Sequence, residues 1–168
     1  MKYRMGSGKL TLVILSFVAL IMLSGCATQE ERAARAAEQT AKVKAALAER
    51  HYKIGVNYMY PNGGRAKSVS FGYGVEVRND SLISYLPYFG RAYNIPYGGG
   101  KGLNFSERIA SYQESQANNG QRLIEIELKN DEDTYLYTIK VFDNGNSSID
   151  VLSRQRERIS YSGEMEFK

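Results

Sequence analysis

Cysteine and histidine are nearly absent from this chain. Of its 168 residues, one is a cysteine, Cys26, and one is a histidine, His51. A single cysteine excludes an internal disulfide, and a single histidine leaves metal sites and serine or threonine nucleophiles without the imidazole partners that they normally use. We therefore expect no metal and no cofactor, and we interpret His51 as a polar residue where a helix meets a strand.

A long apolar run occurs only near the N-terminus. Three basic residues and no acidic residue precede the 14-residue run Leu10–Leu23, which is shorter than the about 20 residues of a membrane-spanning helix. This pattern predicts a signal peptide at residues 1–25. The end of the run, Leu23-Ser24-Gly25-Cys26, resembles the bacterial lipobox, in which the cysteine becomes the lipid-modified first residue. A plain signal peptide followed by a chance cysteine is the alternative.

A lipid on Cys26 would attach the mature protein to a membrane. The residues that follow are Ala27 and Thr28 rather than the aspartate of inner-membrane retention signals. We therefore expect an outer-membrane lipoprotein, either on the periplasmic face or at the cell surface. Glu30 and Glu31 resemble the acidic tags of some surface-exported lipoproteins, but they also suit the first turn of a helix.

The excess of positive charge disappears with the predicted signal peptide. The remaining 143 residues carry 19 basic and 18 acidic side chains, so the isoelectric point near 9 gives no reason to expect a nucleic-acid partner. This length is sufficient for one domain with an apolar core.

Residues 28–50 lack glycine and proline and are rich in helix-forming residues, which predicts a helix. Its apolar stripe is thin, and only Val43 and Leu47 could bury much surface. We predict a lipidated Cys26 with a helical tether at residues 26–44 and a single β domain at residues 45–168. A coiled-coil partner for this helix is the alternative.

From His51 onward apolar and polar residues alternate, as in half-buried strands. We expect the following residues to share buried faces: Tyr52, Ile54, Val56, Tyr58, Tyr60; Val69, Phe71, Tyr73, Val75, Val77; Ile124, Ile126, Leu128; and Tyr137, Ile139, Val141. Shorter strands are expected at 103–105 and near 108–112. Residues 130–133 predict a solvated turn, because they lack the ligand spacing of a calcium loop.

About eight strands joined by short connections, with no helix for a parallel crossover, predict an antiparallel meander. The expected fold class is mainly β, preceded by one N-terminal α-helix. A strongly bent sheet or partly closed barrel is our first choice, and a two-sheet sandwich is the second.

The stretch from Tyr85 to Gly102 interrupts this pattern with four tyrosines, one phenylalanine, two prolines and five glycines. Such a composition predicts a long shaped loop, and loops on a β scaffold often bind ligands. The candidate binding residues are Tyr88, Phe89, Arg91, Tyr93 and Tyr97. We expect at least two of these aromatic residues to be partly exposed on one concave surface with Arg91. The alternative is that they close one end of the sheet.

The run Tyr85-Leu86-Pro87-Tyr88-Phe89-Gly90-Arg91-Ala92-Tyr93 resembles the signature of the bacterial family known as domain of unknown function 4251. The closing segment Arg158–Gly163 resembles the final strand of that family. The resemblance implies a small, mainly β protein that is secreted or lipid-anchored in the envelope of Gram-negative bacteria. It supplies no catalytic residue.

No motif indicates catalysis. The segment Gly98–Gly102 lacks the spacing and the Ser or Thr of a phosphate-binding loop, and the carboxylates are distributed as on a solvated surface. We therefore expect a non-enzyme without catalytic residues. Two functions remain open: a module that binds an envelope protein or a glycan through the aromatic loop, and a structural or assembly lipoprotein. A hydrolase is a distant third.

Overall fold

The computed structural model describes residues 28–70, 72–94, 100–117 and 120–167. These residues belong to two units that divide within helix α2 (Gln29–Ala48), after Arg35. In the first unit the Oγ1 of Thr28 accepts a hydrogen bond from the N–H of Glu31 at 3.3 Å, so Thr28 caps the helix. No helix in the described part of the chain is long and apolar enough to cross a membrane.

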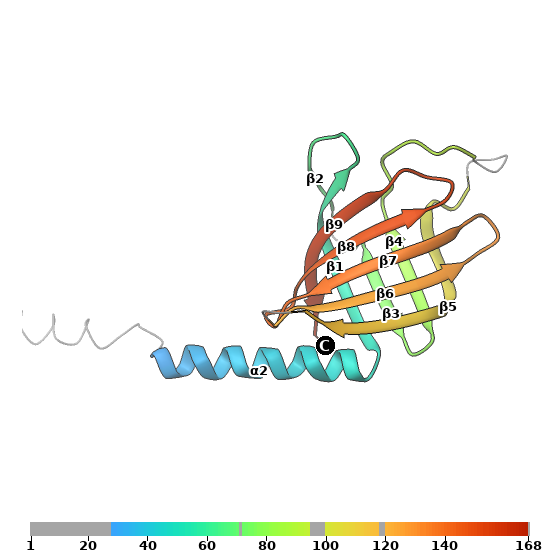
Figure 1. Cartoon of the computed structure of the whole chain (residues 1–168). Helices are drawn as coiled ribbons and strands as arrows, with labels where there is room; N and C mark the ends of the chain where they lie inside the picture. The colour runs from blue at the N-terminus through green and yellow to red at the C-terminus, as the bar shows by residue number, and fades with distance from the viewer. Residues whose placement is uncertain (1–27, 71, 95–99, 118–119, 168) are drawn as a thin grey trace, which may run out of the picture. The chain divides into compact units, whose positions relative to one another are not determined.

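In the second unit the described residues form one nine-stranded antiparallel sheet (Figure 1). The strands are β1 (His51–Pro61), β2 (Lys67–Ser68), β3 (Gly74–Arg78), β4 (Ser81–Leu86), β5 (Leu103–Gln116), β6 (Arg122–Lys129), β7 (Thr134–Val141), β8 (Asn146–Ser153) and β9 (Ile159–Glu166). From β3 to β9 each strand pairs with the next, and β9 pairs with β1. The meander therefore closes into an eight-stranded barrel, with β2 as an extra strand on β1. The predicted fold class is confirmed, and the barrel is more completely closed than we expected.

Strand β1 differs from its predicted pattern because it contains a bulge between Val56 and Tyr58. Up to Val56 the even-numbered side chains are buried, as predicted. The extra residue shifts the alternation by one, so Tyr58 and Tyr60 are exposed and Met59 packs against the core. The prediction that Tyr58 and Tyr60 share the buried face was therefore wrong, because a bulge reverses the facing of every later side chain.

Residues 68–78 do not form the single strand that their alternation predicts. The chain leaves β2 after Ser68, passes Gly72 with a φ of 105°, and enters β3 at Gly74. A positive φ of this kind favours glycine and interrupts a strand. Val75 and Val77 are buried as predicted, whereas Val69 and Tyr73 are only partly buried. The predicted core residue Phe71 lies outside the described residues.

Strand β5 is one 14-residue strand rather than the two short elements that we expected. An irregularity between Ile109 and Ser111 bends it. Its first half pairs with β4 and its second half pairs with β6. The irregularity changes which face the side chains occupy, which explains why the sequence pattern looked interrupted.

The barrel interior is filled by apolar side chains and by tyrosines. Tyr135, Tyr137 and Tyr161 are each at most 1% exposed, and the ring of Phe105 lies 4.8 Å from that of Tyr135. The buried hydroxyls have partners: that of Tyr137 bonds to Ser84 Oγ at 3.0 Å, and that of Tyr161 donates to the Pro87 carbonyl at 2.7 Å. An eight-stranded barrel is just wide enough for side chains to fill it.

The barrel has two ends that differ in what covers them (Figure 1). At the end where β1 begins, the part of α2 after Arg35 contributes Val43 and Leu47 to the core, each 1% exposed. This confirms the prediction that these two residues are buried. We call the opposite end the loop end. It contains the turn after β1, the β4–β5 loop, the β6–β7 turn and the β8–β9 turn.

Candidate functional site

The first part of the β4–β5 loop is held against the β8–β9 turn by main-chain hydrogen bonds. The N–H of Tyr93 donates to the carbonyl of Gln155 at 2.7 Å, and the N–H of Glu157 donates to the carbonyl of Arg91 at 3.0 Å. Ala92 and Arg156 form a β-bridge between these two bonds. Residues 91–93 are therefore placed by the barrel rather than hanging free from it.

Tyr88 orders the same loop from its other side. Its half-buried hydroxyl lies 2.8 Å from the carbonyl oxygen of Arg91 and 3.1 Å from that of Glu157, and it donates to these acceptors. Burial and the negative charge of Glu157 raise the pKa of Tyr88, so the hydroxyl keeps its proton and remains a donor. The Glu157 carboxylate in turn accepts the N–H of Arg91 at 3.2 Å. Tyr88 is thus a structural residue of this loop.

An open hollow of about 450 Å³ lies beside this loop. One side is formed by residues 88–91 and the other by residues 61–64 of the turn after β1, with Glu157 also contributing. The ring of Phe89 is 56% exposed and the side chain of Arg91 is exposed. We call this space the loop-end hollow. It brings together an apolar ring, a guanidinium group and main-chain polar groups of a glycine turn.

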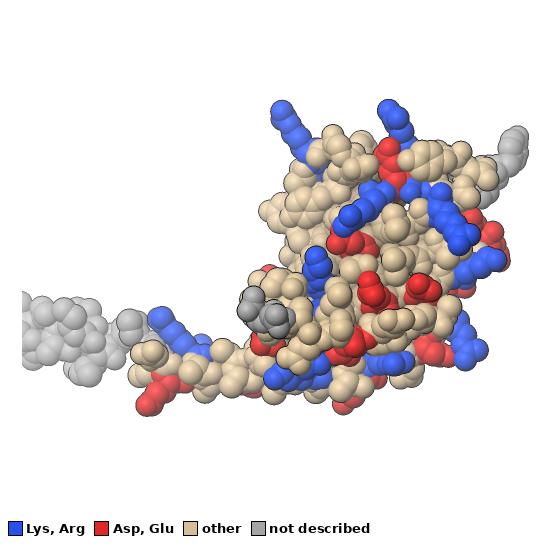
Figure 2. Space-filling model, in the orientation of Figure 1, with Lys and Arg blue, Asp and Glu red and all other residues tan. Residues whose placement is uncertain are grey.

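Several basic side chains lie near the loop-end hollow. The Nζ of Lys67 lies 3.2 Å from the centroid of the Phe89 ring, and Arg65 is exposed in the turn between β1 and β2. Within the described residues, no carboxylate lies within 4.0 Å of the charged groups of Arg65, Lys67 or Arg91. Figure 2 shows basic side chains projecting from the loop end with a few acidic groups among them. Arg91 in the lining and Lys67 at the Phe89 ring can therefore contact a negatively charged group, while the Glu157 carboxylate in the same lining accepts the N–H of Arg91.

The structure separates the five candidate binding residues. Tyr88, Phe89 and Arg91 line the loop-end hollow together. Tyr93 is 68% exposed but lies outside the lining of that hollow. Tyr97 and the predicted lipidation residue Cys26 lie outside the described residues.

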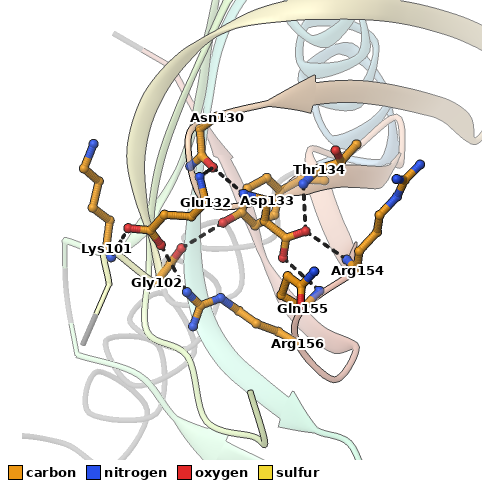
Figure 3. Close-up of polar contacts among 10 residues, drawn as sticks. Lys101, Gly102, Asn130, Glu132, Asp133, Thr134, Arg154, Gln155 and Arg156 are labelled. Carbon is orange, nitrogen blue, oxygen red and sulfur yellow. Dashed lines mark hydrogen bonds and ion pairs between the residues drawn. The ribbon is translucent and has the colours of Figure 1, made fainter. Parts of the chain in front are cut away.

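A polar network at the β6–β7 and β8–β9 turns was not predicted from the sequence (Figure 3). The carboxylate of Asp133 accepts hydrogen bonds from the main-chain N–H groups of Thr134, Arg154 and Gln155 at 2.7, 3.1 and 3.0 Å. Asn130 Oδ1 accepts the N–H groups of Glu132 and Asp133, both at 2.9 Å. These bonds join the β6–β7 turn to the β8–β9 turn.

Glu132 and Arg156 extend this network to the β4–β5 loop. Glu132 accepts the N–H of Lys101 at 2.8 Å and pairs with the Arg156 guanidinium at 3.3 Å (Figure 3). Arg156 is 7% exposed and lies 5.6 Å from the centroid of the Tyr88 ring. Glu132 supplies the paired charge that the buried Arg156 needs. Glu132 also binds Lys101 near the end of the β4–β5 loop, and Arg156 bridges to Ala92 near its start, so the pair connects both parts of the loop to the barrel.

The prediction of a solvated turn at residues 130–133 was therefore wrong in its degree of burial. Asn130 is 8% exposed and Asp133 is 7% exposed, while Asp131 between them is exposed. The Asn-x-x-Asp spacing was the available signal, since Asn and Asp side chains often accept main-chain N–H groups in turns. The partners of Asp133 in the β8–β9 turn lie 21 and 22 residues away, and no local pattern indicates them.

Groups for metal chemistry do not converge in the described part of the chain. There, no three His, Cys, Asp or Glu residues are placed to hold a metal ion. His51 is exposed at the start of β1, next to the end of α2, which is the junction that we predicted.

The fold and the site together define a small up-and-down β-barrel whose loop end holds residues 91–93 of the aromatic loop by main-chain hydrogen bonds. The chain belongs to the family named domain of unknown function (DUF4251), whose model matches residues 34–165. The resemblance noted from the aromatic run and the closing segment is thereby confirmed.

The fold is shared with a solved structure of the same family. The crystal structure of a DUF4251 family protein from Bacteroides eggerthii DSM 20697 matches with a TM-score of 0.58 at 14% sequence identity. The match covers 76% of this chain and 86% of that chain. A comparison with curated proteins found no match.

Proposed function

We propose that this protein is a non-catalytic, lipid-anchored envelope protein that binds a ligand or partner in the loop-end hollow. The observation that carries the proposal is the exposure of Phe89 and Arg91 on one hollow whose backbone is held by the barrel. A loop that only joined two strands would have little reason to expose a large aromatic ring beside an unpaired guanidinium. Pre-ordering also lowers the entropy cost of binding.

The chemistry of the hollow favours a ligand with an acidic group next to an apolar face. Arg91 presents a planar set of donors that fits a carboxylate or a phosphate, and the ring of Phe89 offers a flat apolar surface. The Nζ of Lys67 lies over this ring and adds a second positive charge. An envelope protein segment or a glycan with an acidic group meets these requirements.

The test compares recovery of partners by the wild type and two variants of the full lipidated protein from the envelope that contains it. Phe89→Ala combined with Arg91→Ala should lower recovery of the bound partner by roughly tenfold, because aromatic and arginine contacts often dominate binding energy. Tyr93→Ala is the matched control, since Tyr93 is an exposed aromatic residue of the same loop outside the hollow. The melting temperature of every variant should remain close to that of the wild type.

The same comparison decides for or against the second function, a structural or assembly lipoprotein. The observation that favours this second function is the 68% exposure of Tyr93, which an extended protein contact would cover. Loss of the partner in Tyr93→Ala, with full recovery in the Phe89 and Arg91 double variant, would favour the assembly function. Unfolding of the double variant would identify these side chains as structural and remove the support for binding.

The lipid anchor rests on Leu23-Ser24-Gly25-Cys26 after an apolar run. Cys26→Ala should release the mature domain from membranes, which fractionation followed by immunoblotting measures. Mass spectrometry of the wild-type N-terminus is the direct check. An unmodified N-terminus produced by signal cleavage would contradict the proposal of an outer-membrane lipoprotein, whether on the periplasmic face or at the cell surface.

A further inference from the structure

A second hollow lies on the outer face of the barrel, across β8, β9 and β1, and it does not involve the loop end. Its volume is about 390 Å³, within the range of about 300 to 1,000 Å³ that is usual for small-ligand sites. We call it the outer groove. Its lining includes two aromatic rings, Tyr58 on β1 and Phe142 directly after β7, which are 49% and 44% exposed.

The floor of the outer groove is made of small polar residues. Ser148 of β8 lies opposite Ser162 of β9, and Ser162 in turn lies opposite Tyr58 of β1. Gly163 follows Ser162 at a point where the strands approach so closely that a Cβ would overlap the carbonyl oxygen of Gly55. Small residues in the middle and large rings at the sides produce a hollow on a surface that would otherwise be convex.

The polar groups of the outer groove favour a neutral ligand. Among the described residues that line it, Glu164 is the only charged one, and no lysine or arginine is present. Nucleic acids and acidic polymers need positive charge, which is present at the loop end instead. The lining offers hydroxyls, side-chain amides and one carboxylate, which can donate to and accept from the hydroxyls of a ligand. The Ser162 hydroxyl lies 3.1 Å from the Tyr60 hydroxyl and can form a second hydrogen bond.

The groove is also unsuited to a peptide that adds a strand to the sheet. Strand β8 pairs with both β7 and β9, and β9 pairs with both β8 and β1. Their main-chain groups are therefore occupied, and recognition has to come from side chains. Aromatic rings beside hydroxyl and amide groups match a pyranose, whose C–H face packs on a ring while its hydroxyls bond to the polar groups.

We infer that the outer groove binds an uncharged oligosaccharide, with Tyr58 and Phe142 packing on sugar rings and Ser148, Ser162 and Glu164 bonding to sugar hydroxyls. This site is independent of the loop-end hollow and of the function proposed for it. The two sites differ in charge, in the strands that form them and in the residues whose replacement would affect them.

The test uses short, structurally defined glucan, mannan and chitin fragments as probes, with polygalacturonate fragments as the acidic comparison. Binding to the mature protein is measured by calorimetry and located by shifts of main-chain amide resonances. A neutral fragment should shift resonances of β8, β9 and the bulge of β1. The Tyr58→Ala, Phe142→Ala double variant should lose affinity by roughly tenfold or more, since each ring contact contributes modestly.

Three controls make the outcome decisive. Tyr85→Ala replaces a tyrosine of β4 that is 52% exposed and lies away from the groove, so it should leave the affinity unchanged. Arg91→Ala should also leave it unchanged. Ser148→Tyr keeps both aromatic rings and fills the floor of the groove with a large side chain, so it should abolish binding. This variant still tests the site if the Tyr58 and Phe142 double variant does not fold.

The inference is overturned if no neutral fragment binds, or if the acidic fragments bind equally well. It is also overturned if the shifts map to the loop end and binding disappears only in Arg91→Ala. A result in which Ser148→Tyr binds with the affinity of the wild type would likewise exclude the outer groove as the site.

Discussion

At the residue scale, tyrosine serves opposite purposes in this protein. Tyr137 and Tyr161 are buried in the barrel with hydroxyl partners, whereas Tyr93 is exposed on the aromatic loop. A tyrosine has an apolar ring and a polar tip, so it suits both environments. Its residue type alone therefore could not separate the core tyrosines from the candidate binding residues.

Asp133 shows that one buried side chain can organise a whole end of the barrel. Its carboxylate accepts three main-chain N–H groups from two separate turns. Asp133→Ala should lower the free energy of unfolding by roughly 3 kcal/mol, because three partly buried main-chain donors lose a charged acceptor. Urea denaturation of the two proteins measures this difference.

Asp131 in the same turn provides the matched control. It is exposed, and Asp131→Ala should change the free energy of unfolding by less than about 0.5 kcal/mol. Equal denaturation midpoints for the two variants would show that the Asp133 bonds add nothing to stability. Asp133→Asn, which keeps one acceptor oxygen, should give an intermediate value.

At the element scale, α2 depends on few side chains for its attachment to the barrel. Val43 and Leu47 are its buried residues, while Lys44 between them is exposed. Leu47→Ala should lower the free energy of unfolding by about 2–5 kcal/mol, as removal of a buried leucine side chain usually does. Lys44→Ala, one turn earlier on the exposed side, should have almost no effect.

Denaturation followed by circular dichroism measures the effect of Leu47→Ala and of Lys44→Ala on unfolding. A single transition that shifts to lower denaturant in Leu47→Ala means that the second part of α2 and the barrel unfold together. An unchanged midpoint would contradict the assignment of Leu47 to the core.

The strands show where periodicity succeeds and where it fails. The alternation of β6 and β7 is regular, and its predicted inward residues are all buried. In β1 and β5 an extra residue reverses the facing partway along the strand. A bulge depends on how two strands pair, so the sequence of one strand does not reveal it.

At the scale of the whole molecule, the barrel resists ionisation of its interior. Burial raises the pKa of Tyr52, Tyr137 and Tyr161 above the ordinary value of 10. In the unfolded chain these hydroxyls lose their protons near pH 10, whereas the folded barrel keeps them. The unfolded state then binds fewer protons, so stability falls as the pH rises above 10.

We expect the free energy of unfolding to be insensitive to these groups below pH 10 and to decline above it. Each proton that only the folded state retains contributes a slope of about 1.4 kcal/mol per pH unit. Tyr137→Phe should make the decline less steep by removing one such group. Below pH 10 the same variant should lower the free energy of unfolding by about 1 kcal/mol, because the hydrogen bond between Tyr137 and Ser84 is lost.

Ile139→Val is the control for this experiment, since Ile139 is equally buried and does not titrate. It should lower stability by about 1 kcal/mol at every pH and leave the alkaline slope unchanged. Urea denaturation over a range of pH on both sides of 10 provides the comparison. Identical slopes for the wild type and Tyr137→Phe would contradict a contribution from Tyr137.

The sequence by itself determined the secondary-structure class, the antiparallel order of the strands and the position of the aromatic loop. These features follow from local periodicity, from short connections and from glycine and proline, all of which can be read along the chain. The sequence also identified the family through the aromatic run and the closing segment. It predicted a strongly bent sheet or partly closed barrel, but not the full closure, because the pairing of β1 with β9 joins residues about a hundred positions apart.

Only the tertiary structure decided which residues form the candidate sites. Phe89 and Arg91 share a hollow because the turn after β1 lies opposite the aromatic loop. Tyr58 faces outward because of a bulge, and it lines the same groove as Phe142 only after β1 pairs with β9 and the barrel closes. Such contacts are set by strand register and closure, which depend on the packing of the whole core rather than on any one segment.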